Sequence, residues 1–191
     1  MALTSKLEAV NTMIGVIGES PINSISGSSL PVSVVTALNV LDEVSIEVQS
    51  EGWHYNTEHI YPLVRNTSNK FSLPSNTLKI DVPIDKYNDI DIVQRGGTLY
   101  DRKNHTDVFS ADLDVSITFE LIFEELPQQF RNYITIRAAR KFANRFLGSP
   151  EIESFTLRDE INAKATAIDS DSENADRNIF DNYDVLRVVD R

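Results

Sequence analysis

The chain has 191 residues, of which 41% are hydrophobic and 25% are charged, as expected for a globular protein with one or two cores. It contains no cysteine, which excludes disulfides, thiolate metal sites and cysteine nucleophiles. The formal net charge of −11 opposes general binding to nucleic acid, because such binding depends on neutralising phosphates. The N-terminus has no signal-peptide pattern, and no apolar run approaches the roughly 20 residues that span a membrane.

Two helices are predicted at the start of the chain. Ser5 and Glu8 have the spacing of a capping box, which predicts a first helix from Ser5 to Ile17, ended by Gly18 and Pro21. After a serine-rich loop, Pro31 opens a second helix that runs to about Ser50. Apolar residues at helical spacing mark the buried faces, namely Leu7, Val10, Met13 or Ile14, and Ile17 in the first helix and Val34, Leu38, Leu41, Val44 and Val48 in the second.

The middle of the chain changes from a helical period to a period of two. Residues 78–82 alternate as a half-buried strand, and residues 113–123 form the longest predicted strand, with its odd-numbered residues on one face. Gly96-Gly97, between residues 90–94 and 98–100, predicts a two-residue hairpin turn. This part of the sequence therefore indicates an antiparallel β-module.

Helical periodicity returns after Leu126-Pro127. A strongly basic helix follows, with a predicted apolar stripe at Phe130, Ile134, Ala138, Phe142 and Phe146. Gly148 is predicted to end it as a left-handed cap, and Ser149-Pro150-Glu151 to cap and open a fourth helix that reaches about Ile168. The acidic stretch 169–174 is expected to be weakly structured.

Large apolar residues reappear at the end of the chain, at Ile179, Phe180, Tyr183, Val185, Leu186, Val188 and Val189. They favour a terminus that either folds back on its own bundle or docks on a neighbouring subunit. The fold class that follows is α+β, a four-helix bundle with an inserted antiparallel β-module. Residues 1–52 supply the N-terminal helical pair, 53–125 the β-module, and 126–191 the C-terminal helical pair and tail.

Catalytic and metal-binding patterns are weak. The three histidines, His54, His59 and His105, have no metal-ligand spacing, and the sequence has no phosphate-binding loop or nucleophile elbow, so no metal or cofactor is predicted. The alternative worth stating is a glycoside hydrolase, which needs two carboxylates about 5–10 Å apart. Its only candidates, Glu124, Glu125, Asp89 and Asp91, come from 29 acidic residues, and a single tryptophan offers little for stacking sugars.

Four segments occur in an order that resembles a known family. They are Arg131–Glu153 (RNYITIRAARKFANRFLGSPEIE), Leu7–Pro21 (LEAVNTMIGVIGESP), Glu51-Gly52-Trp53, and Arg95–Arg102 (RGGTLYDR). The ordered set, over about residues 5–155, resembles the tail tubular protein A family, the head-to-tail adaptors of short-tailed phages. Loops 22–30 and 64–77, and the chain after Asp159, show no match.

The resemblance implies a structural protein of the virion and no enzymatic activity. It implies a ring of twelve copies between the portal and a tail nozzle of the tail tubular protein B type, with tail fibres as a further contact, assembled in the host cytoplasm. The ring would form a channel for genome retention and ejection, and would make no contact with a membrane. A ring of acidic subunits also suits DNA that passes through without specific binding.

The candidate interface residues each have a local alternative. The basic residues Arg131, Arg137, Arg140, Lys141 and Arg145 either solvate the outer face of their helix or pair with acidic surfaces of a neighbouring subunit or the portal, with DNA binding disfavoured. Trp53 either fills the junction between the bundle and the β-module or anchors a ring contact. Arg95, Tyr100 and Arg102 either pack locally or contact the next ring of the tail through the hairpin.

Overall fold

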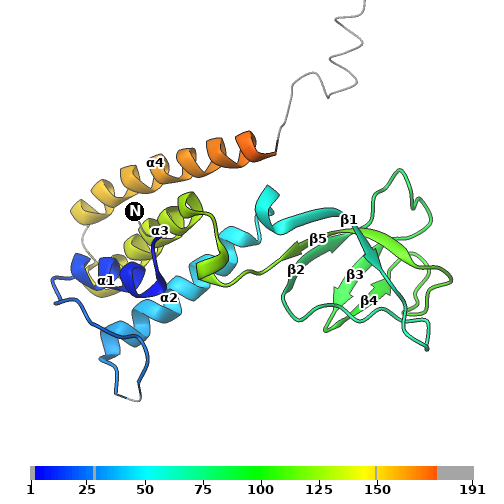
Figure 1. The fold of residues 1–191 in the computed structure, drawn as a ribbon, viewed down its shortest axis with the longest axis horizontal. Helices are drawn as coiled ribbons and strands as arrows, with labels where there is room; N and C mark the ends of the chain where they lie inside the picture. The colour runs from blue at the N-terminus through cyan, green and yellow to red at the C-terminus, as the bar shows by residue number, and fades with distance from the viewer. Residues whose placement is uncertain (1–2, 28, 149, 176–191) are drawn as a thin grey trace, which may run out of the picture. The chain divides into compact units, whose positions relative to one another are not determined.

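The computed structural model describes residues 3–27, 29–148 and 150–175, and it confirms the mixed α+β class (Figure 1). The chain divides into two compact units. Unit 1 combines residues 1–37 with 127–191, and unit 2 is the continuous segment 38–126. The boundary falls within helix α2 (Val32–Gln49), so the second half of this helix belongs to the unit that holds the strands.

Unit 1 begins with helix α1 (Lys6–Val16), whose predicted capping box is present. The Glu8 amide donates to the Ser5 hydroxyl at 3.2 Å, and the Glu8 carboxylate accepts from the Ser5 amide at 2.8 Å. The pKa of Glu8 is lowered first by the hydrogen bond from the Ser5 amide and then by one from the Ser5 hydroxyl, which donates to the same carboxylate at 3.1 Å. Helix α1 packs against α3 and has four fully buried residues, Ala9, Val10, Met13 and Ile14.

Helices α3 (Gln128–Leu147) and α4 (Pro150–Asn174) pack against each other in unit 1. Gly148 has a φ of 58°, which confirms the left-handed cap, whereas the cap predicted at Ser149 lies outside the described residues. Phe146 was expected on the buried face, but it is 45% exposed, with its ring 4.6 Å from that of Phe142 one turn earlier in the helix.

The prediction of weak structure at residues 169–174 is wrong, because α4 continues as helix to Asn174. From Leu157 onwards, where the side chains of α4 are described, the buried residues are Ala163, Ala167 and Asp171, the last only 8% exposed. Alanine has the highest helix propensity and lets helices approach closely, but it gives a weak apolar signal in sequence. The seven large apolar residues predicted to dock between Ile179 and Val189 lie outside the described residues.

Unit 2 contains two small antiparallel sheets. Strands β1 (Thr57–Leu63), β5 (Leu113–Phe119) and β2 (Thr77–Asp81) form one sheet in the order β1-β5-β2. Strands β3 (Ile92–Arg95) and β4 (Thr98–Asp101) form the predicted hairpin, turned by Gly96-Gly97 with φ of 61° at Gly96. Two 3-10 helices, η1 (His54–Asn56) and η2 (Phe123–Glu125), flank the larger sheet in the chain.

Strand β5 ends four residues before its predicted end at Phe123. The backbone of Leu121 is instead bonded by a side chain, because the Gln49 carboxamide accepts from its amide at 2.7 Å and donates to its carbonyl at 3.1 Å. A glutamine from α2 thus takes the position that a neighbouring strand would occupy. The alternating residues of β5 point into a core made by Leu63, Phe71, Ile80, Ile92, Leu99, Phe109, Leu113, Val115 and Ile117.

Candidate functional site

Arg131 is the first of the candidate interface residues on α3, and it is buried. Its guanidinium donates to the carbonyl of Thr4 at 3.0 Å, and only 5% of the residue is exposed. Gln128 completes this attachment, accepting from the Thr4 amide at 2.8 Å and donating to its hydroxyl at 2.7 Å. Arg131 therefore ties the N-terminal segment to α3, and the alternative of a solvated outer face is wrong for this residue.

Arg137 and Arg140 both face Glu160 of α4. Arg140 Nε forms a short hydrogen bond with Glu160 Oε2, and Arg137 Nε lies 3.9 Å from Glu160 Oε1. The three side chains are between 13% and 23% exposed, so the pairings are largely shielded from water. Arg137 also donates to the Tyr133 hydroxyl at 3.1 Å. Two of the candidate interface arginines therefore link α3 to α4 within one chain.

The remaining basic residues of α3 are more accessible. Lys141 is half-buried and Arg145 is exposed, one turn further along the helix. Next to Arg145, the half-exposed ring of Phe146 adds apolar surface. The basic side chains of α3 that a partner can reach therefore lie in the C-terminal part of the helix.

Trp53 lies directly after α2 in unit 2 and is 9% exposed. Its indole Nε1 donates to the carbonyl of Val48 at 2.6 Å, and its amide donates to Asn56 Oδ1 at 2.9 Å. Gly52, which precedes it, has a φ of 84°, a conformation that favours glycine. These contacts make Trp53 a packing residue at the end of α2, and little of its surface remains for another chain.

Gln49 and Asn56 are structural residues that sequence reasoning missed. Asn56 Nδ2 donates to the carbonyls of Gln49 at 3.0 Å and Phe119 at 2.9 Å. Together with the bonds from Gln49 to Leu121, these amides join the end of α2 to the end of β5. No local pattern marks a buried amide whose partner lies 63 or 72 residues away in the chain.

The hairpin residues Arg95, Tyr100 and Arg102 do not form one cluster. The Arg95 guanidinium carbon lies 3.5 Å from the centroid of the Tyr100 ring, a stacked cation–π contact. Arg102 Nε lies 3.8 Å from Asp91 Oδ2, and both of these side chains are more than half exposed. Arg102 thus makes a surface ion pair, whereas Arg95 is held by an aromatic ring.

Asp101, at the end of β4, organises the loops next to the hairpin. Its Oδ1 accepts from the amides of Asp91, Lys103 and Asn104, at 3.2, 2.9 and 3.3 Å, and its Oδ2 accepts from the Asn104 side chain at 2.7 Å. Burial alone would raise the pKa of Asp101, but these hydrogen bonds together outweigh burial and lower the pKa below its ordinary value.

This lowered pKa makes the stability of unit 2 sensitive to acid. A carboxylate with a depressed pKa stabilises the folded state above its unfolded pKa, about 3.9 for aspartate, and this contribution is lost as the pH falls through the folded value. We expect Asp101→Asn to lower the free energy of unfolding by about 1–2 kcal/mol at pH 7 and by less below pH 3. Urea denaturation from pH 7 to pH 2.5 measures the difference, and a deficit that persists unchanged at the lowest pH would contradict this assignment.

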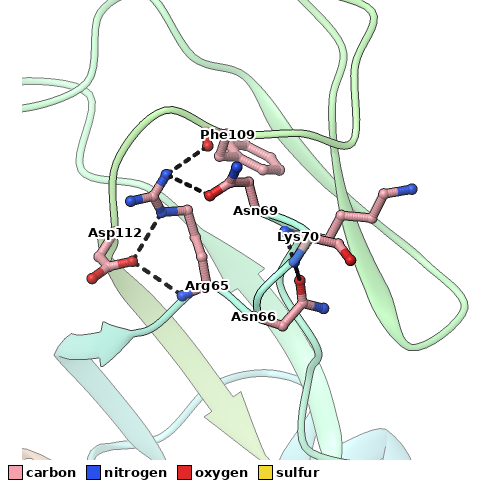
Figure 2. Close-up of polar contacts among 7 residues, drawn as sticks. Arg65, Asn66, Asn69, Lys70, Phe109 and Asp112 are labelled. Carbon is pink, nitrogen blue, oxygen red and sulfur yellow. Dashed lines mark hydrogen bonds and ion pairs between the residues drawn. The ribbon is translucent and has the colours of Figure 1, made fainter.

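Arg65 joins the loop after β1 to the loop before β5 (Figure 2). Figure 2 shows its guanidinium between Asp112, Asn69 and Phe109, with Nε 3.0 Å from Asp112 Oδ1 and Nη1 2.8 Å from the Phe109 carbonyl. The Arg65 amide also donates to Asp112 at 3.0 Å, and this backbone bond, followed by the guanidinium, lowers the pKa of Asp112. Asn66 closes the turn by accepting from the Lys70 amide at 3.0 Å (Figure 2). The loop that showed no family match is therefore tightly ordered.

The carboxylates considered for a hydrolase lie in two segments of unit 2, the loop before β3 and the 3-10 helix η2. Asp89 and Asp91 pair with Lys103 and Arg102 at 3.6 and 3.8 Å, and Glu124 and Glu125 are exposed on η2. A polar groove of about 470 Å³ lies along the larger sheet and includes His59, Ser116 and Thr118. Across the part of the chain that the structure describes, no three metal-capable side chains come together. None of the described helices combines the length and apolar character that crossing a membrane requires.

Comparison with known families gives one match. A family model described as tail tubular protein matches residues 7–177, about nine tenths of the chain. The match includes loops 22–30 and 64–77 and continues beyond Asp159, so it is longer than the resemblance visible in individual motifs. No individual curated protein matches the sequence. The chain belongs to the tail tubular protein family, and it is a structural component of a phage tail.

Proposed function

We propose that the protein is the head-to-tail adaptor of its virion, a homo-oligomeric ring of twelve copies, as the tail tubular protein A resemblance implies. In this proposal unit 1 contacts the portal, and unit 2 contacts the tail nozzle and, at the periphery, tail fibres. The ring gives the genome a channel for retention and ejection, and the protein acts by assembly and not by catalysis. The family match over residues 7–177 carries the proposal.

The distribution of charge supports passage of DNA without specific binding. Unit 2 has 16 acidic and seven basic residues, a formal charge of −9, so most of the net −11 of the chain lies in this unit. A channel wall with this charge repels phosphates at contact distance, and DNA can slide along it. Retention of duplex DNA by the purified protein at physiological salt would contradict this part of the proposal.

Electron microscopy and mass measurement of the purified protein, alone and mixed with the portal of the same phage, test the adaptor function. We expect rings, or portal particles with added density at their narrow end. A protein that stays monomeric and ignores the portal would contradict the proposal. Release of reducing sugar from host polysaccharide would instead support the hydrolase alternative.

The basic helix α3 offers a sharper test of the portal contact. We propose that Arg137, Arg140 and Arg145 contribute to contacts with the portal or a neighbouring subunit, but reversing the first two would also break the pairing with Glu160. We therefore expect Lys141→Glu combined with Arg145→Glu to weaken portal binding by at least about tenfold, because each reversal replaces an attraction by a repulsion.

Arg158→Glu is the matched control, since Arg158 is an exposed base on the neighbouring helix α4. Binding is measured by sedimentation with the portal at two salt concentrations, because contacts between exposed charges weaken as salt rises. Equal loss of binding in the control and in the double variant would show an effect of net charge and would remove α3 from the interface.

A further inference from the structure

We infer that the tip of the β3–β4 hairpin is a docking site for a protein segment that presents a carboxylate to Arg95. The inference rests on the proposed adaptor function, since it names the chemistry of the contact that unit 2 makes with the next tail component. Three observations carry it: a local lack of charge, a guanidinium held in place by a ring, and the absence of an acidic partner for that guanidinium.

The hairpin tip, defined as residues 71–78 and 92–100, is poor in charge. Its 17 residues include one charged side chain, Arg95, whereas the other 72 residues of unit 2 include 22. The two segments are joined in space, because the Leu73 amide donates to the Gly97 carbonyl at 2.9 Å and Ser72 forms a bridge with Thr98. Four of the 17 residues, Phe71, Thr77, Ile92 and Leu99, are buried, and the other 13 still include Arg95 as their one charged side chain. An accessible surface that has few charges but includes arginine and tyrosine resembles the centre of a protein interface.

Arg95 differs from most bases of unit 2 in having no acidic partner among the residues that the structure describes. All seven basic residues of the unit are described, and five of them form ion pairs, namely Arg65, Lys70, Lys86, Arg102 and Lys103. The described contact of the exposed Arg95 guanidinium is with the Tyr100 ring, at 3.5 Å. Acidic residues outnumber basic ones more than two to one in this unit, so an arginine that contacts an aromatic ring and not a carboxylate is unusual there.

The stacked geometry fits a carboxylate. Stacking uses the face of the guanidinium and leaves the N–H groups along its edge directed away from the ring, where a carboxylate can accept two parallel hydrogen bonds. Because the side chain is already ordered on Tyr100, binding costs less conformational entropy than it would for a free arginine. Gly96 and Gly97, both exposed, have no side chains and leave the approach to the turn open.

A carboxylate on a protein is favoured over a DNA phosphate. The formal charge of −9 on unit 2 repels DNA, because several neighbouring phosphates approach the unit at the same time and each is repelled. A single carboxylate in an otherwise neutral or basic segment meets the uncharged tip and gains the contact with Arg95. The docking segment is therefore a protein surface with an exposed aspartate or glutamate.

The test uses the full chain and the nozzle protein of the same phage. Three variants are compared with the wild type: Arg95→Glu, Arg95→Lys, and the control Arg102→Glu, which reverses a base on the same hairpin outside the charge-poor tip. Ring formation is measured by electron microscopy, and nozzle binding by sedimentation or calorimetry. We expect Arg95→Glu to weaken nozzle binding at least about tenfold with ring formation intact, Arg95→Lys to be intermediate, and the control to stay within about twofold of the wild type.

The outcomes separate the inference from the proposed function. Nozzle binding by Arg95→Glu that equals that of the wild type, or an equal loss in Arg102→Glu, overturns the inference and leaves the adaptor proposal standing. Loss of rings in Arg95→Glu, with its circular dichroism unchanged, overturns it too, since the tip would then contact a neighbouring copy. If the wild type binds duplex DNA and Arg95→Glu does not, the inference is overturned, because the ligand of Arg95 would then be a DNA phosphate and not a protein carboxylate. A wild-type chain that binds neither portal nor nozzle contradicts the adaptor function itself.

Discussion

Replacing Glu160 by glutamine should lower the free energy of unfolding of unit 1 by about 2–3 kcal/mol. Glu160 is the carboxylate that Arg137 and Arg140 share, and its side chain is only 13% exposed. The neutral amide keeps the size of the side chain but removes the negative charge that both shielded guanidinium groups face. Helix α4 should therefore detach more easily from α3, and amide hydrogen exchange in α4 should accelerate.

The measurement is urea denaturation followed by two signals. Trp53, the only tryptophan, lies in unit 2, so its fluorescence reports on that unit, whereas helical circular dichroism includes the helices of unit 1. The change in dichroism midpoint should be large in Glu160→Gln and small in Asp159→Asn, which alters the neighbouring, exposed carboxylate. A variant carrying Arg137→Met, Arg140→Met and Glu160→Leu should recover most of the loss, because an apolar set has no unpaired charge. Equal effects at the two carboxylates would show that the pairing contributes little.

Gln49→Leu should destabilise unit 2 by about 2–4 kcal/mol. Gln49 is fully buried, and its carboxamide pairs with both the amide and the carbonyl of Leu121. Leucine is an apolar side chain of comparable length, so most of the cost comes from leaving two backbone groups of the chain without partners. The same change removes the bond from Gln49 Nε2 to the Ser45 hydroxyl at 3.0 Å.

Gln94→Leu is the control, since Gln94 is an exposed glutamine of the same unit whose side chain contacts only the nearby Gly96 carbonyl, at 3.3 Å. Trp53 fluorescence during urea denaturation measures both variants. We expect Gln49→Leu to lower the urea midpoint strongly, and Gln94→Leu to change the free energy of unfolding by no more than about 0.5 kcal/mol. A Gln49→Leu protein as stable as the wild type would mean that solvent or another group replaces the lost partners at Leu121.

Sequence predicted the features of this fold that depend on residues near one another in the chain. Ser5 and Glu8 specify a helix start, Gly96-Gly97 a hairpin and Gly148 a helix end, because each acts through its own backbone or through a side chain three residues away. The predictions that were wrong concern segments whose structure depends on residues far away in the chain. Strand β5 stops at Phe119, and the backbone that follows is bonded by Gln49. Helix α4 continues past Ile168, where its next buried residue is the polar Asp171, which gives no apolar signal in the sequence.

The candidate interface residues show the same division. A basic stripe on a helix identifies α3, but only the position of Glu160 on another helix shows that Arg137 and Arg140 are engaged within the chain. Arg131 is buried because of Thr4, which lies 127 residues earlier. Arg95 and Tyr100 were identified from the motif alone, but their stacking follows from the register of β3 and β4, which pairs Arg95 with Thr98 and Val93 with Tyr100.

The way in which the two ends of the chain combine in unit 1 sets an order for folding during synthesis. Unit 2 is continuous, so all of its strands have left the ribosome once residue 126 has emerged, and it can form its core while translation continues. Helix α1 packs on α3, and Thr4 binds Gln128 and Arg131, so the N-terminal segment must wait for more than 120 further residues. A nascent chain stopped before α3 should therefore have a protease-resistant unit 2 and an exposed α1. Unit 1 is therefore completed after unit 2, once α3 and α4 have been synthesised, and the portal-facing surface proposed for α3 forms with it.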